Sequence, residues 1–308
     1  MNLRSVDLNL LVALDALLRE LHVTRAAERI GLSQPAMSNA LSRLRQIFKD
    51  DLLVRTSLGM QATPRAIEIM EPTRQILRSI ERVLDSDSAF VPEVSGRTFA
   101  IRMSDLLGRI LLPPLLSDLG KTAPAIRIEV IHLSPSRTTE ALEKDELDLA
   151  VSMGLAHSTS ISSEPLMSDR MVCVMRKGHP AATGRKLTLD RFLTERHLKV
   201  SMSPTDLRFV DDVLSKRGLS RNVAVNLPHW MLVPRVLECS DLISVMPRLF
   251  AQAVAQSTLA VRELPLPSEP FDWSLYWHRR HEGNQAILWL RNRLTEAAKA
   301  YGRSPGLG

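Results

Sequence analysis

The sequence predicts an α/β protein that begins with an all-α winged helix-turn-helix. Three observations lead to this expectation. Apolar residues recur at helical spacing in three segments before residue 50, two short β-like segments follow them, and strands alternate with helices after residue 96. A chain of 308 residues is also long enough for two or three domains that each bury a core of their own.

The composition excludes several classes of protein. Apolar residues make up 44% and charged residues 24%, as in ordinary globular proteins, and no apolar run of about 18 residues predicts a membrane span. The first twenty residues contain Arg4, Asp7 and Asp15 and lack a small-residue cleavage site, so we expect no secretory signal and a cytoplasmic protein. Cys173 and Cys239 lack metal or redox spacing and are expected to be reduced thiols. The net charge of +6 favours an anionic partner.

Three short helices are expected first. Asp7 is placed to cap the first helix, and Gly31 follows the second, where the left-handed backbone of a helix ending favours glycine. Ser33 caps the third helix, and Pro35 lies in its first turn. Ala27 fits the point where the two helices of a helix-turn-helix cross, because a close approach needs a small residue. An ordinary helical hairpin inside a larger core is the alternative. The expected helices span about 8–20, 23–30 and 33–48.

A hairpin and a long helix are expected next. Two β-like pieces, 52–55 and 60–63, flank a turn at 57–59 and predict a wing. Pro64 then opens a helix to about Leu84, in which Pro72 predicts a kink. Apolar residues seven apart along this helix predict pairing with a second copy. They are Ile69, Met70, Ile76, Leu77, Ile80, Val83 and Leu84.

The outward face of the third expected helix carries groups that suit double-stranded DNA. Amide and hydroxyl side chains read base edges in the major groove, and we expect this role for Gln34, Ser38 and Asn39. The expected DNA-binding residues are Ser33, Gln34, Pro35, Ser38, Asn39, Ser42, Arg43, Arg45, Arg55 and Thr56.

Arginines and a helix cap favour contact with the DNA backbone. Ser33, Arg43 and Arg45 are placed for phosphates, although a solvated surface is an equal interpretation for Arg45. Arg55 on the wing is expected in a flanking minor groove, where narrow A·T tracts concentrate negative potential.

The rest of the chain alternates strands with helices. Strands are expected at 98–103, 126–132, 147–152, 171–175, 198–202, 223–226, 242–245, 260–264 and 273–278. Helices are expected at 110–119, 138–144, 207–216, 231–239 and 286–300. The polar segment 85–96 is expected to link this region to the long helix.

The run TRAAERIGLSQPAMSNALSRLRQIFKDDLLVRTSLGMQATP resembles the signature of LysR-type transcriptional regulators. The resemblance implies a winged helix-turn-helix, a dimerising linker helix with a hinge, and an effector-binding domain of two lobes like those of periplasmic binding proteins. The expected bounds are 1–65, 66–96 and 97–308, with one lobe at about 97–169 and 276–300 and the other at about 170–275. The family's usual assembly implies a homodimer or homotetramer.

Two later segments, PHWMLVPRVLECSDLISVMPRLFA and SLYWHRRHEGNQAILWLR, resemble one branch of that family. The branch contains nodulation regulators that answer flavonoids and regulators that answer salicylate or nitroaromatic compounds. It implies a small aromatic, often acidic inducer. The second-lobe loop departs from relatives that place a polar amide there, because this chain has Ser203, Pro204 and Thr205.

Ligands of two-lobed α/β domains bind where strands end and helices begin. Serine, threonine and helix N-termini in such places suit a carboxylate or phenolate, and His229 could pair with an acid. For each serine a simple helix cap is the alternative, and Trp277 and His278 are expected in the core and hinge. The expected effector-binding residues are Ser104, Asp105, Ser134, Ser136, Gly154, Ser203, Thr205, His229 and Trp230.

Asp105, His229 and the serines also raise the possibility of a hydrolase, but no catalytic motif or metal-ligand spacing accompanies them. We therefore expect no enzyme, no cofactor and no metal site. An architectural DNA-binding protein without a ligand is a second possibility, although the long α/β region would be superfluous in it. An exported solute-binding protein is a third, and it needs no DNA module.

The expected mechanism joins these parts. A dimer presents two recognition helices to an inverted-repeat operator. A small inducer that binds one assembly state better than another shifts the balance between them and changes the access of RNA polymerase.

Overall fold

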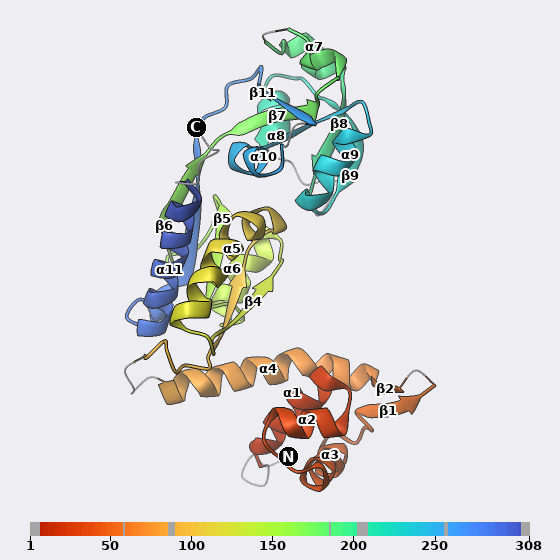
Figure 1. Cartoon of the computed structure of the whole chain (residues 1–308), viewed down its shortest axis with the longest axis vertical. Coiled ribbons are helices and arrows are strands. Elements are labelled where there is room, and N and C mark those ends of the chain that lie inside the picture. The colour runs from red at the N-terminus through yellow and green to blue at the C-terminus, as the bar shows by residue number, and fades with distance from the viewer. Residues whose placement is uncertain are drawn as a thin grey trace. The chain divides into compact units, whose positions relative to one another are not determined.

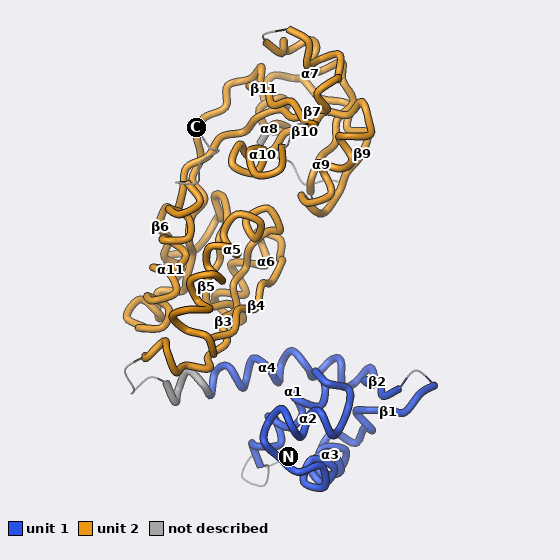
Figure 2. Tube along the Cα trace, viewed as in Figure 1, with its two compact units in different colours: residues 1–89 blue, residues 90–308 orange. Residues whose placement is uncertain are grey.

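The computed structural model describes residues 7–57, 59–85, 90–184, 186–201, 209–255 and 258–302, without the side chains of 81–85 and 209. The chain forms two compact units, residues 1–89 and 90–308, which are coloured separately in Figure 2. Among the described residues, no helix combines the length and apolar character that a bilayer span requires. Cys173 is buried, Cys239 is exposed, and both are free.

The first unit is built around three short helices, as the sequence predicts. They are α1 (Asn9–Glu20), α2 (Val23–Arg29) and α3 (Gln34–Phe48). Leu14 and Leu17 of α1 pack against Met37 and Leu44 of α3, and all four are almost fully buried. Ala27 is also fully buried, so α2 and α3 approach each other over a small side chain.

Local signals fix the ends of these helices. The Asp7 carboxylate accepts a hydrogen bond from the Asn9 amide at 3.0 Å, and Ser33 Oγ accepts one from the Ala36 amide at 3.3 Å. Gly31 has a φ of +69°, which glycine adopts without a Cβ clash, so the chain can turn directly from α2 into α3. These caps and this turn give α2 and α3 the connection that the sequence predicts.

The wing is a two-stranded antiparallel hairpin, β1 (Leu53–Thr56) and β2 (Gly59–Ala62). Its strands lie within one residue of their expected bounds. The long helix α4 follows at Pro64–Asp85 and continues through Pro72 (Figure 1).

The first half of α4 packs within its own chain. Ala66 is fully buried in the helix-turn-helix core, and Ile69 and Met70 pack against that core. Arg74 forms an ion pair with Asp15 of α1 at 2.9 Å. Ile69 and Met70 thus use part of their apolar surface within their own chain, and the pairing role that we expected for them stays a prediction. Ile76 remains 47% exposed, whereas the side chains of Val83 and Leu84 lie outside the described residues.

The second unit contains two five-stranded sheets, one in each lobe. The strand order of the first lobe is β4-β3-β5-β12-β6, and that of the second is β11-β7-β10-β8-β9. The first-lobe strands are β3 (Thr98–Arg102), β4 (Arg127–Ile131), β5 (Leu149–Met153), β6 (Ile161–Asp169) and β12 (Phe271–His278). The second-lobe strands are β7 (Met171–Arg176), β8 (Arg196–Val200), β9 (Asn222–Leu227), β10 (Leu242–Pro247) and β11 (Leu259–Glu263).

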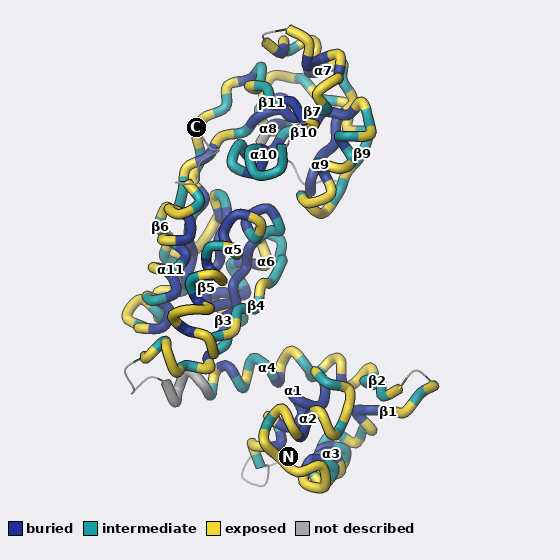
Figure 3. Tube along the Cα trace, viewed as in Figure 1, coloured by how far each residue is buried: buried dark blue, intermediate teal, exposed yellow. Residues whose placement is uncertain are grey.

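Helices cover both faces of these sheets. They are α5 (Asp105–Thr122), α6 (Pro135–Glu143), α7 (Leu189–Thr194), α8 (Phe209–Ser215), α9 (Val233–Glu238), α10 (Arg248–Val254) and α11 (Gln285–Gly302). In β3, Ile101 faces the core beneath α5 and α11, while Ala100 faces α6. Both faces are therefore buried, and β3 and β5 are dark blue along most of their length in Figure 3.

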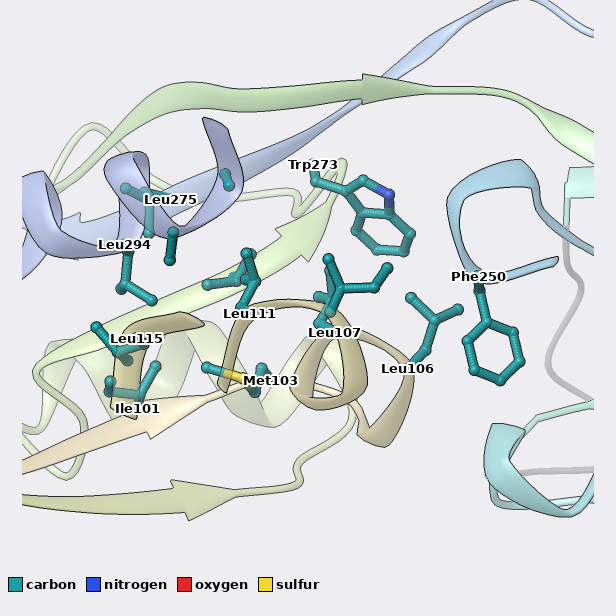
Figure 4. Packing of buried hydrophobic residues seen from close by; sticks show 14 of the residues in the cluster. Ile101, Met103, Leu106, Leu107, Leu111, Leu115, Phe250, Trp273, Leu275 and Leu294 are labelled. Atoms are coloured by element: carbon teal, nitrogen blue, oxygen red, sulfur yellow. The ribbon is translucent and has the colours of Figure 1, made fainter. Parts of the chain in front are cut away.

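One core runs from the first lobe into the second. Leu106 and Leu107 of α5 belong to the same buried cluster as Phe250 of α10, and Figure 4 shows Leu106 facing Phe250. The lobes thus contact each other through α5 and α10, in addition to the two chain crossings between them.

The structure corrects several expected elements. The strand β6 and the helices α7 and α10 were missed. The strand β6 lies at the sheet edge and contains Pro165, so its exposed face gives no clear alternation of apolar residues. The helix α5 begins at Asp105, earlier than the expected 110, because Gly108 in its first turns conceals the start. The chain returns to the first lobe at Phe271 rather than at 276, because β12 pairs with β6 from that residue onward.

One buried histidine makes the second lobe sensitive to acid. His197 is fully buried on β8, and its Nε2 lies 2.8 Å from the carbonyl oxygen of Phe192, which can only accept a hydrogen bond. Burial lowers the pKa of His197 from 6.5 to about 4. The unfolded chain therefore binds more protons than the folded chain between these values, and the free energy of unfolding should fall as pH drops from 6.5 to about 4.

Chemical denaturation across this pH range measures the effect. The His197→Gln variant lacks the titrating ring and should show a shallower fall than the unmodified protein. Equal slopes in the two proteins would show that His197 is not responsible.

Candidate functional site

The outward face of α3 is open to solvent. Gln34, Asn39 and Ser42 are exposed, and Ser38 is half-buried, while Met37 on the opposite face is fully buried. The Gln34 amide donates a hydrogen bond to Ser38 Oγ at 3.0 Å, so neighbouring polar groups lie together on one face. This face can present amide and hydroxyl groups to the edges of base pairs.

The arginines beside this face differ in their roles. Arg43 is exposed and lies 3.3 Å from the Asp7 carboxylate, a weak surface pair that leaves its guanidinium accessible. Arg45 instead donates hydrogen bonds to the carbonyl oxygens of Asp51 and Leu53, at 2.8 and 2.9 Å. Arg45 therefore has a structural role, and its expected phosphate contact stays a prediction. Arg45 ties the end of α3 to the first strand of the wing.

The wing is held at its base and at its tip. The Asp50 carboxylate accepts hydrogen bonds from Thr63 Oγ1 at 2.6 Å and from the Leu52 amide at 2.7 Å, and these bonds lower the pKa of Asp50. At the tip, Thr56 Oγ1 donates to the Gly59 carbonyl at 2.9 Å. Arg55 is exposed on β1, and no described residue forms an ion pair with it. A firmly held hairpin thus presents an accessible guanidinium.

Ser33 and Pro35 build the start of α3. Both are exposed, and their main local roles are those of helix cap and first-turn residue. The amides of this first turn point out of the helix and can still approach a phosphate.

A cavity of about 120 Å³ lies between the two lobes of the second unit. Polar and apolar groups from both lobes form its wall. The lining residues are Arg102, Ser104, His132, Pro135, Ser152, Met153, Met171, Lys199, Val200, Ser201, Val210, Arg221, Pro228, Trp230, Val245, Pro247 and Trp273.

Cationic side chains of the second lobe share one carboxylate in this wall. Arg221 contacts Asp211 through two hydrogen bonds of 2.7 and 3.0 Å, and Lys199 Nζ lies 3.4 Å from the same carboxylate. Lys199 is 7% exposed and Arg221 is similarly buried. Two buried positive charges thus face one described negative charge, and their excess charge favours an anion in the cavity.

The first lobe adds a third cation. Arg102 is buried at the end of β3 and donates hydrogen bonds to the carbonyl oxygens of Leu133 and Val151, at 2.8 to 3.1 Å. These bonds fix the guanidinium plane, so the wall keeps a positive charge in a defined place.

Two tryptophans give the cavity flat apolar surfaces. Trp273 comes from β12 of the first lobe, and Trp230 begins a short 3₁₀ turn of the second. Trp230 packs edge-to-face on Phe250 with centroids 6.0 Å apart. Trp273 packs in the same manner on Phe271 at 5.4 Å, and Figure 4 shows its indole beside Leu107. Flat rings and cations together suit an aromatic anion.

Among the expected effector-binding residues, Ser104 and Trp230 line the cavity. Ser104 also caps α5, because its Oγ accepts a hydrogen bond from the Leu107 amide at 3.4 Å. Ser203 and Thr205 lie outside the described residues.

The other expected residues have different surroundings. Asp105 Oδ2 accepts a hydrogen bond from the Met231 amide at 2.9 Å and so joins the lobes instead of lining the cavity. Ser134 caps α6, and its hydroxyl contacts that of Ser136 at 3.2 Å. His229 is exposed, and its ring lies 6.0 Å from that of His132, which does line the wall. Gly154 turns the chain after β5 with a φ of +49°. None of these four side chains or Gly154 is part of the lining.

The lining residues Arg102, Ser152, Lys199, Arg221 and Trp273 were not predicted, because we looked for ligand contacts after strands. Four of these residues lie within strands, and Arg221 directly precedes β9. A signal was present. A charged residue at the end of a largely apolar strand, such as Arg102 in β3, is seldom buried without a partner or a function.

Comparison with protein families identifies both units. Residues 8–67 match the model described as the bacterial regulatory helix-turn-helix protein, lysR family. Residues 93–299 match the LysR substrate binding domain.

Individual relatives match over almost their whole length. The chain is 34% identical to the HTH-type transcriptional activator NagR of Ralstonia, over 96% of this chain and 98% of that protein. It is also 34% identical to the HTH-type transcriptional activator NahR of Pseudomonas putida, over 94% and 97%, and to Nodulation protein D 2 of Sinorhizobium fredii, over 97% and 96%.

Solved structures of transcription regulators have the same fold as this chain. A probable transcriptional regulator of Pseudomonas aeruginosa is 34% identical, with a TM-score of 0.81 over 95% of this chain and 97% of that one. Full-length CbnR in complex with its target DNA has the same fold, with a TM-score of 0.65 and 16% identity over 96% and 100%.

Arg55 on the wing and Arg45 on α3 allow a matched test. Arg55→Ala should weaken binding to an A·T-flanked operator about tenfold and lower the salt slope by about one, while leaving stability unchanged. Arg45→Ala should instead lower the free energy of unfolding by about 1 to 3 kcal/mol, because two backbone carbonyls lose their donor.

DNA titrations at several salt concentrations and thermal melts measure these effects, with Arg55→Lys as a control that keeps the charge. An unchanged salt slope for Arg55→Ala would exclude the wing contact.

Proposed function

The chain belongs to the LysR family of DNA-binding transcription regulators, and we propose that it senses a small aromatic anion in the cavity between its two lobes. The relatives that match it are transcription regulators, not enzymes. The inducer controls how the protein engages its operator.

The observation that carries the proposal is the combination of Lys199, Arg221 and two tryptophans in one cavity wall. A carboxylate beside Lys199 and Arg221 balances their excess charge, because Asp211 is shared between them. A ring between Trp230 and Trp273 replaces water on flat apolar surfaces from both lobes. A ligand that needs both lobes for its contacts favours the arrangement in which they lie close together.

On the DNA side, α3 enters the major groove with Gln34, Ser38 and Asn39 toward the bases. Arg43 and Ser33 hold the backbone, and Arg55 reaches a flanking minor groove. Two copies joined through α4 bind an inverted repeat, as a homodimer or a pair of dimers. Because the partner is chromosomal DNA, the protein acts in the cytoplasm, where the operator-bound assembly changes the access of RNA polymerase.

A lysine variant tests the anion site. Lys199→Met keeps most of the unbranched side chain and leaves Asp211 paired with Arg221, so the fold should persist. Benzoate should bind it about 10- to 100-fold more weakly than the unmodified protein, because a charge-assisted hydrogen bond is lost. The neutral analogue benzamide should bind both proteins equally weakly.

Calorimetry measures the affinity for benzoate and for benzamide. The matched control is Lys177→Met, which changes an exposed lysine of the same lobe. A wider panel of aromatic acids, phenols, flavonoids and aliphatic acids is screened by the shift in melting temperature. Stabilisation by none of them, with DNA binding intact, would favour a ligand-independent regulator.

A substitution on the exposed face of α4 tests whether two copies of the chain pair through this helix. Ile76→Asp should dissociate the oligomer, since a carboxylate in an apolar seam is strongly disfavoured. Ile67 is 59% exposed and lies nine residues earlier, on the opposite side of the helix at roughly 100° per residue, so Ile67→Asp is the control. Sedimentation velocity compares the two variants. If Ile76→Asp stays assembled, α4 does not pair through this face.

A further inference from the structure

The two chain crossings between the lobes run side by side. The strand β6 ends at Asp169, and β7 of the second lobe begins at Met171. On its return the chain enters β12 at Phe271, which pairs directly with Asp169 in the antiparallel ladder. The pair of Asp169 and Phe271 therefore marks the point at which both segments pass from one lobe to the other.

The Asp169 carboxylate connects three elements at this point. Its Oδ1 accepts hydrogen bonds from the amides of Arg170, at 2.7 Å, and Leu249, at 3.2 Å. Its Oδ2 accepts one from the indole N–H of Trp273, at 3.1 Å. Leu249 lies in the first turn of α10 in the second lobe, and Trp273 lies in β12 of the first. Asp169 is only 7% exposed, so water contributes little to these bonds.

Trp273 links this junction to the cavity. Its ring lines the cavity wall, and its N–H points to Asp169. A bulge interrupts the β12–β6 ladder between Trp273 and Ser274, where the pairing shifts from Met167 to Pro165. Bulges redirect side chains and recur beside binding sites, and this one adjoins the residue that faces the cavity.

The negative charge of the Asp169 carboxylate strengthens its hydrogen bonds. Burial raises the pKa of Asp169, while the N–H donors around it act in the opposite direction by stabilising the carboxylate. Hydrogen bonds to a buried carboxylate are stronger than neutral ones, so the orientation of the Trp273 ring and the position of the α10 start are fixed by the same group.

We propose that Asp169 is a positioning residue that couples Trp273 in the cavity wall to the start of α10 in the second lobe. A ligand packed against Trp273 then stabilises the lobe arrangement in which all three bonds are intact. The role in ligand response rests on the proposed function of the cavity, whereas the link between Trp273 and α10 can be tested without any ligand. Because coupling is reciprocal, a change at Trp273 should alter the stability of the α10 start, and a change at the α10 start should alter the position of Trp273.

The chain provides a matched control on the same strand. Trp277 is also buried in β12, and its indole N–H donates to Glu282 at 2.8 Å, but it does not line the cavity. Trp277→Phe and Trp273→Phe thus remove the same kind of bond, from an indole to a carboxylate, at two different places. Asp169→Asn keeps an oxygen for the amide donors and replaces the oxygen that accepts from Trp273 with an N–H₂ group.

The first experiment uses the ligand-free full-length chain and hydrogen exchange of the peptide that contains Leu249. Asp169→Asn and Trp273→Phe should each speed its exchange about tenfold, and the double variant should be no faster than either single one. Trp277→Phe should leave the rate unchanged. A normal rate in Trp273→Phe, or an equal increase in Trp277→Phe, would overturn the proposal.

The second experiment adds saturating benzoate. The unmodified protein should show slower exchange at the same peptide, while Asp169→Asn should bind benzoate, as measured by calorimetry, without that slowing. Equal slowing in Asp169→Asn would contradict the coupling. If the unmodified protein does not bind benzoate, that result counts against the proposed function for this class of ligand, and the ligand-free experiment decides the role of Asp169.

Discussion

Burial of positive charge in the cavity wall is the constraint on which the account of this protein depends. Lys199 and Arg221 are taken out of water, yet they share the single carboxylate of Asp211. Charges of this kind are costly to bury unless they are balanced, so the site gains most from a ligand that brings a negative group of its own. Arg102 extends the positive surface to the other lobe, where carbonyl oxygens orient it. The same wall carries two tryptophans, and the proposed chemistry of the ligand rests on the two properties together.

The fold places these groups by joining two sheets through two chain crossings and a shared core. The helix α5 packs against α10, and its first residue, Asp105, holds the Met231 amide across the lobes. Asp169 plays a similar part at the chain crossings. Carboxylates of the first lobe thus accept hydrogen bonds from backbone amides of the second lobe, so the cavity and the contacts between lobes are not independent. This connection gives a bound ligand a route by which it can alter the second unit as a whole.

The sequence predicted the helix-turn-helix closely because its signals are local. Ser33, Gly31 and the leucine spacing act within a few residues, and caps and turns depend little on the rest of the chain. The cavity was predicted poorly because its residues come from strands of different lobes, and Lys199 and Trp273 meet only after both sheets have formed. Arg45 and Ile69 show the same limit in the first unit, since each has an intramolecular partner that sequence spacing does not reveal. The strand β6 was missed because an edge strand with Pro165 lacks the pattern of a buried one.

We propose that a ligand bound to the second unit changes how the first unit holds DNA. The most direct measurement is the bend angle and affinity of a fluorescently labelled operator fragment, determined by energy transfer with and without a saturating aromatic acid that stabilises the protein. We expect the ligand to change the bend angle, the affinity or both, because it binds one arrangement of the lobes better than another. A protein that binds the acid in its cavity and yet holds the operator with the same bend and the same affinity would contradict the account.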